Sequence, residues 1–272
     1  ARPSTIDYYR NLKPFSEQEL HQWKTMLEQR RDWLKTRGIE YLFVIAPNKN
    51  TIYPEHMPGR ISKVHSQSRM DQLLAYLKKH SFYNAPDLRP VLLESKIQRK
   101  IYQRTDTHWN YYGSFLAYRF LMSFANNHLN LRAKVKPLSQ RQLPFDTVDW
   151  AGGDLAGMLD LNREVMREDK VNINFGTFFT YTGAKIRTRN RLVRHGYTEC
   201  ENASPLKLMV VHDSFFKKLK PYFSETFSRV RYIWDWNLGF YPEIILKEKP
   251  DLVIDEMAER FLLDPVPVNP LK

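Results

Sequence analysis

The chain has 272 residues, enough for one large domain with a well-formed core or for two small ones. Its 42 basic and 30 acidic residues give a formal net charge of +12. This charge favours anionic partners, although a solvated basic surface with no ligand explains it equally well. The single cysteine, Cys200, excludes an intrachain disulfide and cysteine-based zinc sites.

Nothing in the sequence resembles a membrane span or an export signal. No run approaches the ~18 consecutive apolar residues that a transmembrane helix needs. The first residues, "ARPSTIDYY", lack the apolar segment of a signal peptide. We therefore expect any export signal or membrane anchor to be absent from this chain.

The first elements in chain order are a helix, a strand and a second helix. Ser16 and Glu19 have capping-box spacing ahead of an apolar stripe, which predicts a helix that ends at Gly38. The apolar run at 39–47 predicts a parallel strand buried on both faces. Residues 68–81 predict another capped helix.

The middle of the chain is less regular. Residues 82–88 predict a strand and residues 89–96 a short helix, while Asn110 can cap a helix at 111–127. Residues 133–203 do not continue the alternation of strands and helices, so we expect an insertion there with some β character. It includes the strand-like "GTFFTYTG" and the basic tract "KIRTRNRLVR".

The alternation then resumes. Strands are predicted at 206–211, 229–236 and 250–257, and helices at 214–227, interrupted by Pro221, and 241–249. Strands that alternate with helices predict an α/β fold with a mainly parallel sheet and helices on both faces. Ligands in such folds bind beyond the carboxyl ends of the strands, which here are residues 46–49, 212–214 and 234–237.

Two motifs carry the chemistry. In "VVHDSF" a strand leads directly to Ser214 at the start of a helix, which exposes the hydroxyl and places a backbone N–H where it can stabilise an oxyanion. Serine needs a base, and "TDTHW" offers one. In extended chain Asp106 can reach Nδ1 of His108 and leave Nε2 for the serine, while Trp109 walls the site. The alternatives are a capping Asp with a buried structural His, or a metal site, which is disfavoured because no further ligand lies at obvious spacing.

Five blocks occur in the order seen in one family: "APNKNTIYPEHMP", "TDTHWN" with "YYG", "GGDLAGML", "VVHDSF" and "PDLVIDEMAERFL". Together they resemble the alginate O-acetyltransferase branch of the SGNH-hydrolase superfamily. The resemblance implies a three-layer α/β/α sandwich and assigns a catalytic triad to Asp106, His108 and Ser214. It also departs in one respect, because His212 stands where the family has a glycine.

The resemblance further implies an activity and a setting. We expect residues 1–272 to form one catalytic domain without a C-terminal carbohydrate-binding module. This domain would acetylate an exopolysaccharide, with alginate as the first candidate, through an acetyl-serine intermediate. A membrane-bound O-acyltransferase would supply the acetyl groups in the periplasm. We expect a monomer with no cofactor, no metal and no nucleic-acid partner, since no nucleic-acid-binding module is recognisable. The alternatives are an acetylesterase with the same triad and a non-catalytic polysaccharide-binding protein on a degenerate hydrolase fold.

Further residues are candidates for oxyanion or substrate contacts. Asn48 can supply a second oxyanion donor, and Lys49 can bind a uronate carboxylate. The alternative is that Asn48 is an ordinary loop residue and Lys49 a solvated surface lysine. Trp234 and Trp236 can stack on sugar rings, although alternate aromatic residues in a strand are more often core. One strand face would carry a row of basic side chains that suits a polyanion: Lys185, Arg187, Arg189 and Arg191.

Overall fold

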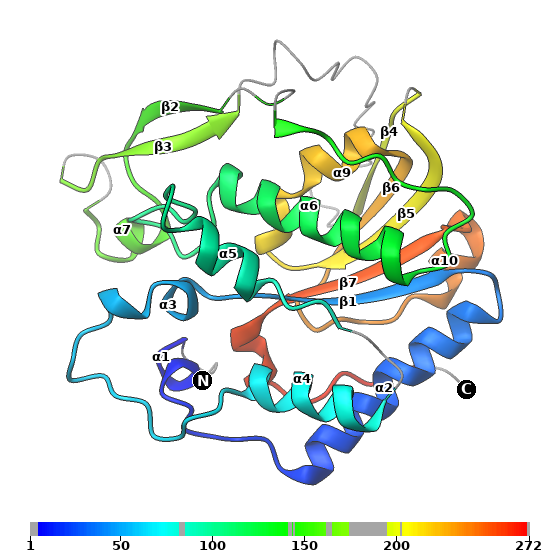
Figure 1. Cartoon of the computed structure of the whole chain (residues 1–272), viewed down its shortest axis with the longest axis horizontal. Helices are drawn as coiled ribbons and strands as arrows, with labels where there is room; N and C mark the ends of the chain where they lie inside the picture. The colour runs from blue at the N-terminus through cyan, green and yellow to red at the C-terminus, as the bar shows by residue number, and fades with distance from the viewer. Residues whose placement is uncertain are drawn as a thin grey trace.

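The computed structural model describes residues 5–81, 85–140, 143, 145–161, 165–173, 195–201 and 203–270 (Figure 1). Its centre is a five-stranded sheet in the order β1-β7-β5-β6-β4. The strands are β1 (Glu40–Ala46), β4 (His195–Glu199), β5 (Ser204–His212), β6 (Phe227–Trp234) and β7 (Leu252–Ala258). All neighbouring pairs are parallel except β4 with β6, so the predicted mainly parallel sheet is confirmed.

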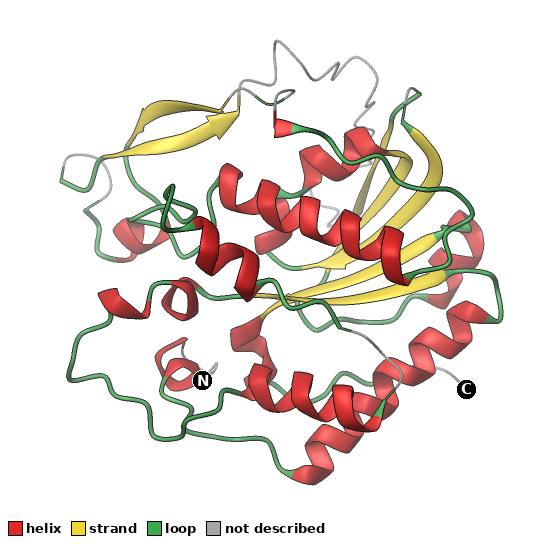
Figure 2. Cartoon of the chain, viewed as in Figure 1, coloured by secondary structure: helices red, strands yellow, loops and turns green. Residues whose placement is uncertain are grey.

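Helices pack on both faces of this sheet and give the expected three-layer sandwich (Figures 1 and 2). The described α-helices are α1 (Thr5–Tyr9), α2 (Glu17–Lys35), α3 (Lys49–Ile52), α4 (Arg69–His80), α5 (Arg89–Ser95), α6 (Tyr111–His128), α7 (Asp154–Met158), α9 (Lys220–Thr226) and α10 (Pro242–Glu248). Short 3-10 turns are η1 (Pro54–His56), η3 (Phe215–Lys218) and η4 (Glu259–Leu263). Of the helices in the described ranges, none combines the length and apolar character that crossing a bilayer requires.

The alternation of side chains along β1 explains why the fold has two cores. Leu42 and Val44 lie in the cluster beneath α5, α6 and α9, whereas Phe43 and Ile45 lie in the cluster beneath α2, α4 and α10. All four are buried, as expected of a strand covered on both faces. The continuous apolar run of this strand therefore follows from its position in the sheet.

Local sequence signals set the helix boundaries. The predicted capping box of Ser16 and Glu19 is present, and α4 begins with a second box formed by Ser68 and Asp71. Gly38 has φ +69° just after α2, a conformation that suits glycine. Asn110 accepts a hydrogen bond from the Gly113 N–H and caps α6 as predicted.

Two expectations need correction. Residues 85–88, the described part of the strand expected at 82–88, are not a strand, because they pair with no other strand and lead directly into α5. The insertion expected at 133–203 does contain an antiparallel hairpin outside the central sheet, formed by β2 (Phe145–Trp150) and β3 (Glu168–Ile173) (Figure 2). However, β4 pairs with β6 and so belongs to the central sheet. The segments 176–183 and 185–194 lie outside the described residues.

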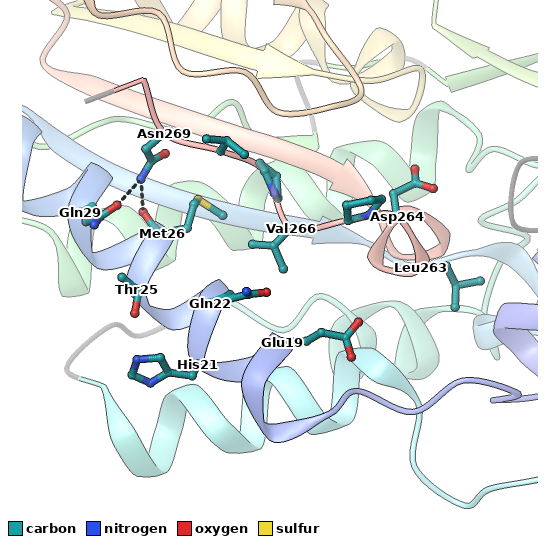
Figure 3. A pocket seen from close by; sticks show the side chains of 13 residues that line it. Glu19, His21, Gln22, Thr25, Met26, Gln29, Leu263, Asp264, Val266 and Asn269 are labelled. Carbon is teal, nitrogen blue, oxygen red and sulfur yellow. Dashed lines mark hydrogen bonds between the residues drawn. The ribbon is translucent and has the colours of Figure 1, made fainter. Parts of the chain in front are cut away.

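A groove of about 690 Å³ runs between α2 and the segment 263–269 (Figure 3). The Asn269 side chain holds this segment on the helix by donating to the Met26 carbonyl and to Gln29, both at 3.0 Å. Among the described residues, none of the candidate catalytic or substrate-binding residues lines this groove. The candidate site lies elsewhere, at the carboxyl ends of the strands.

Candidate active site

Ser214 lies at the carboxyl end of β5, where the strand passes into η3. Its backbone is in the right-handed helical region, with φ −70° and ψ −23°. The preceding Asp213 is buried and fixes the turn, because its carboxylate accepts the N–H groups of Phe215 and Ala258, each at 2.8 Å. The loop that carries the serine is thus tied to the end of the neighbouring strand β7.

The structure brings the Asp106–His108 segment directly against this serine. Nε2 of His108 lies 2.8 Å from Oγ of Ser214, and Nδ1 lies 2.6 Å from Oδ1 of Asp106. Burial alone would raise the pKa of the Asp106 carboxyl, but hydrogen bonds from His108 and the positive charge of Lys218 outweigh it and lower that pKa to about 2. The carboxylate is therefore ionised across the physiological range and can stabilise an imidazolium.

The backbone that produces this contact differs from the extended chain that the sequence predicts. Thr107 and His108 form a bend, and Oδ1 of Asp106 also accepts the His108 N–H at 2.8 Å. An Asp side chain that accepts the N–H two residues later forms an Asx turn. One carboxylate oxygen thus fixes both the backbone and the ring of His108.

Trp109 lies behind the loop that carries Ser214. It is completely buried, so it cannot touch a substrate in this conformation. Its Nε1–H donates to the Phe215 carbonyl at 3.0 Å, and its ring packs edge-on against the Phe215 ring. Trp109 therefore supports the serine loop from behind.

Asn48 is buried at the end of β1, close to the serine loop. Its Oδ1 accepts from Nη1 of Arg260 at 3.0 Å, and the Arg260 guanidinium lies over the Phe215 ring at 5.2 Å. Within the described part of the chain, Nδ2 of Asn48 is buried without a hydrogen-bond partner. A buried N–H group without a partner is costly, so this donor is suited to a ligand oxygen.

Lys49 is not a solvated loop residue. Its ammonium donates to the backbone carbonyls of Arg104, at 2.6 Å, and Asp106, at 3.3 Å. Burial lowers the pKa of Lys49, and the nearby carboxylates of Glu168 and Asp106 only partly offset this effect. The side chain supports the segment that carries Asp106 and adds positive charge beside it.

The tryptophans at the end of β6 are partly exposed. The Trp234 ring contacts the His212 ring edge-on, with 5.5 Å between centroids, and the Lys217 ammonium lies over it at 4.8 Å. Trp236 follows two residues later. The predicted basic positions Arg187 and Arg189 lie outside the described residues.

His212 does not disturb the turn and does not compete as a base. It is the last residue of β5, and none of the described residues with positive φ other than glycine lies in this turn, so the conformational freedom of glycine is not required. Burial, together with the charges of Lys220 and Lys217, lowers the pKa of His212 to about 3. The ring is therefore neutral, and it packs between Phe216 and Trp234.

Comparison with known families gives a match over much of the chain. The model of the SGNH hydrolase-like domain of the acetyltransferase AlgX matches residues 7–175, more than half of the chain. The chain belongs to this family. It is an AlgJ/AlgX-like member of the SGNH superfamily.

Individual relatives are more distant. A probable alginate O-acetylase AlgJ of Pseudomonas syringae is 34% identical over 88 residues, which are 32% of this chain and 22% of that protein. The corresponding protein of Pseudomonas fluorescens is 31% identical over 102 residues, covering 37% and 26%. The matched region thus spans about a quarter of the length of these curated relatives.

Solved structures support the fold. PatB1 of Bacillus cereus has a TM-score of 0.65 at 17% identity, with 91% of each chain covered. The O-acetyltransferase domain of Pseudomonas putida AlgJ has a TM-score of 0.63 at 18% identity, with 97% of this chain and 90% of that chain covered. At such identities the similarity establishes the SGNH-like fold of this family member and no more.

Sequence reasoning missed two carboxylates that support the Asp106–His108 segment. Asp154, the first residue of α7, accepts the Thr107 N–H at 2.7 Å and also the Thr107 hydroxyl. Glu168 of β3 is buried and accepts the N–H groups of Arg104 and Thr105, each at 2.8 Å. The only available signal was the family block "GGDLAGML", which contains Asp154 but gives it no role.

Asp106, His108 and Asp154 lie close enough together to hold a metal ion, and are the one such group in the described ranges. Their atoms already have other partners, however. Nδ1 of His108 faces two carboxylates and must therefore carry a proton, which leaves it no lone pair for a metal. Nε2 faces the serine hydroxyl. This donor set is better suited to proton transfer than to metal binding.

Proposed function

We propose that this chain is an O-acetyltransferase that moves acetyl groups onto the hydroxyls of an anionic exopolysaccharide, with alginate as the first candidate. The observation that carries the proposal is the alignment of Ser214 Oγ, His108 and Asp106, with separations of 2.8 and 2.6 Å. Membership of the AlgX-type family and the basic net charge of +12 support it.

The first half of the reaction acetylates the serine. Nε2 of His108 accepts the proton of Ser214, and Oγ attacks the carbonyl carbon of the acetyl ester. The resulting oxyanion can accept a hydrogen bond from the free Nδ2–H of Asn48. The intermediate then collapses to acetyl-serine, and the leaving alcohol takes the proton from His108.

The second half transfers the acetyl group to the polymer. His108 removes the proton of a sugar hydroxyl, whose oxygen attacks the acetyl-serine carbonyl and releases Ser214 as the free alcohol. An acetate ester and a sugar hydroxyl thus become an alcohol and an acetylated sugar, with no cofactor or metal in the balance. If water attacks instead, the same residues act as an acetylesterase.

Charged and aromatic side chains near the site suit an acidic sugar. Lys217 is exposed and lies over the partly exposed Trp234, so a cation and an aromatic ring are presented together. We assign these residues, with Trp236, to contacts with the acceptor polymer. Lys49 contributes positive potential behind Asp106, because its ammonium is held on backbone carbonyls.

The setting is proposed on family grounds. We propose that the protein works in the periplasm as a monomer and receives its acetyl groups from a membrane-bound O-acyltransferase.

Hydrolysis of 4-nitrophenyl acetate tests the first half of the reaction. Ser214→Ala and His108→Ala are expected to reduce kcat/KM by at least about 10³-fold, because the nucleophile or its base is lost. Ser66→Ala and His21→Ala remove exposed residues of the same types and should leave the rate unchanged. Undiminished hydrolysis in both site variants would disprove the proposed mechanism.

Mass spectrometry of oligosaccharides tests the second half. The protein is incubated with 4-nitrophenyl acetate and either alginate or cellulose oligosaccharides. Acetylated alginate fragments would support both the transferase activity and alginate as its substrate. Acetylated cellulose fragments would support the transferase activity but identify cellulose as the substrate. Free acetate alone, with both oligosaccharides unchanged, would favour the acetylesterase.

A further inference from the structure

His108 faces two carboxylates at Nδ1, one more than the proposed triad needs. Oδ1 of Asp106 lies 2.6 Å away and Oδ2 of Asp154 lies 3.5 Å away. The Asp106 side chain is 12% exposed, whereas the Asp154 side chain is 33% exposed. The two acids therefore reach the same ring nitrogen from different environments.

Asp154 is held in this position by several contacts. Its two oxygens accept the backbone N–H and the hydroxyl of Thr107, the residue directly before the histidine. The N-terminal turn of α7 is fixed in turn on Thr105, whose hydroxyl accepts the Gly153 N–H at 3.0 Å and whose carbonyl accepts the Leu155 N–H at 3.0 Å. The position of Asp154 beside the ring is thus fixed by bonds to Thr107 and by the bonds of its neighbours to Thr105.

One oxygen of Asp154 serves both Thr107 and the ring of His108. Oδ1 accepts the Thr107 N–H, and the Oδ2 that accepts the Thr107 hydroxyl is also the oxygen that lies 3.5 Å from Nδ1. When His108 takes the serine proton, the ring becomes an imidazolium whose Nδ1–H can be shared between both acids. A carboxylate at this distance favours the charged form of the ring.

Other charged groups surround the ring. Besides Asp106 on its own segment and Asp154 on α7, they are Lys49 of α3, Glu168 and Lys170 of β3, Asp213 of the serine turn and Lys218 of η3. Lys218 lies near both acids, and its charge partly offsets theirs. Only the two aspartates lie within 4 Å of a ring nitrogen of His108 among the acids of the described segments.

We propose that Asp154 is a second positioning carboxylate for His108, which shares the charge of the imidazolium with Asp106 during acyl transfer. This inference rests on the proposed function of Ser214 and His108. The proton stays on Nδ1 throughout, because only Nε2 exchanges a proton with the serine and the substrate. The inserted segment then contributes directly to catalysis, in addition to supporting the fold.

The test uses Asp154→Asn, which is isosteric and can still accept the Thr107 N–H. Without the charge, His108 holds a proton less readily, so the acidic limb of the kcat/KM profile for 4-nitrophenyl acetate should move to lower pH by about half a unit to one unit. The plateau should fall by roughly 5- to 20-fold, because the imidazolium in the transition state is less stabilised. Asp154→Glu retains the charge and should restore the limb.

A double-mutant cycle tests the sharing of charge. Asp106→Asn should cost more in the Asp154→Asn background than in the wild type, because the remaining acid can no longer compensate. Thr107→Val, which removes the hydroxyl that orients Asp154, should give a smaller shift in the same direction. The control is Asp149→Asn, an exposed acid of the same inserted region that pairs with Arg167.

The outcomes separate the two proposals. A shift of the acidic limb of the kcat/KM profile, together with non-additive effects of Asp106→Asn and Asp154→Asn, supports the role of Asp154 as a second positioning carboxylate. An unshifted limb in both Asp154→Asn and Thr107→Val, with additive effects, would refute it even if activity falls. Hydrolysis by the wild type that does not depend on Ser214 would instead disprove the proposed function.

Discussion

Replacing Gly153 by alanine should displace the Asp106 carboxylate with little change to the rest of the fold. A Cβ at Gly153 would lie 2.5 Å from Cβ of Asp106, 2.8 Å from its Oδ2 and 2.8 Å from the Trp150 ring. Non-bonded carbon atoms prefer about 3.5–4 Å, so a gap of about 1 Å must open. The backbone of Gly153 has φ −101°, which alanine adopts readily, so the effect is steric.

The magnitude follows from which group can move. Gly153 is tied to Thr105 through its N–H, so the glycine and the segment before Asp106 cannot separate freely. Overpacking of this kind costs about 1–3 kcal/mol of stability. A displacement of about 1 Å at a positioned group costs about 10²-fold in rate. We therefore expect kcat/KM for 4-nitrophenyl acetate to fall roughly 100-fold, with a modest loss of stability.

The matched control is Gly196→Ala, since no atom lies within 4 Å of a Cβ added at that glycine in β4. Both variants are compared by ester hydrolysis and by thermal unfolding. Gly196→Ala should match the wild type in activity. If Gly153→Ala retained activity within twofold of the wild type, the tight contact between this loop and Asp106 would not be what positions the carboxylate.

Three further predictions follow from single contacts. Asn48→Ala removes the unpaired buried donor, so kcat should fall by about 10²- to 10³-fold while KM for the ester changes little. A higher KM with unchanged kcat would argue against an oxyanion contact. Trp109→Phe removes the hydrogen bond to the Phe215 carbonyl, so the free energy of unfolding in urea should fall by about 1 kcal/mol. An unchanged free energy of unfolding would mean that this bond does not stabilise the fold. Burial raises the pKa of Glu259 from 4.5 to about 7. The protonated side chain therefore stabilises the folded state by at most about 3 kcal/mol below pH 4.5, and this contribution is lost as the pH rises through 7. Glu259→Gln should therefore gain stability relative to the wild type between pH 5 and pH 8 in urea titrations, and parallel curves would contradict this.

Much of the fold could be predicted because its signals are local. The capping boxes of α2 and α4 involve residues three positions apart, and the apolar run of β1 reflects burial on both faces. The place of β4 could not be predicted in the same way. A five-residue strand that joins the edge of a sheet in antiparallel orientation is defined by its partner β6, which lies thirty residues further along the chain.

The contacts of the candidate site are likewise of two kinds, local and long-range. Asp106 and His108 are two residues apart, so their contact arises in an extended chain and also in the observed Asx turn. Asp154 and Glu168 reach the same segment from the inserted region, and their contacts span 47 and 63 or 64 residues. No periodicity links such positions. Only the packing of α7 and β3 against the loop brings them together.

The meeting of His108 and Ser214 is a long-range contact of the same kind, and the residue after each of them strengthens it. Nε2 of His108 contacts Oγ of Ser214 at 2.8 Å, and Nε1 of Trp109 donates to the Phe215 carbonyl at 3.0 Å. Consecutive residues of one segment therefore bond to consecutive residues of the other. Two bonds fix a relative orientation that a single bond would leave free to rotate, and the buried aromatic pair keeps water from the second bond. In each motif the aromatic residue that directly follows the polar one thus takes part in this contact.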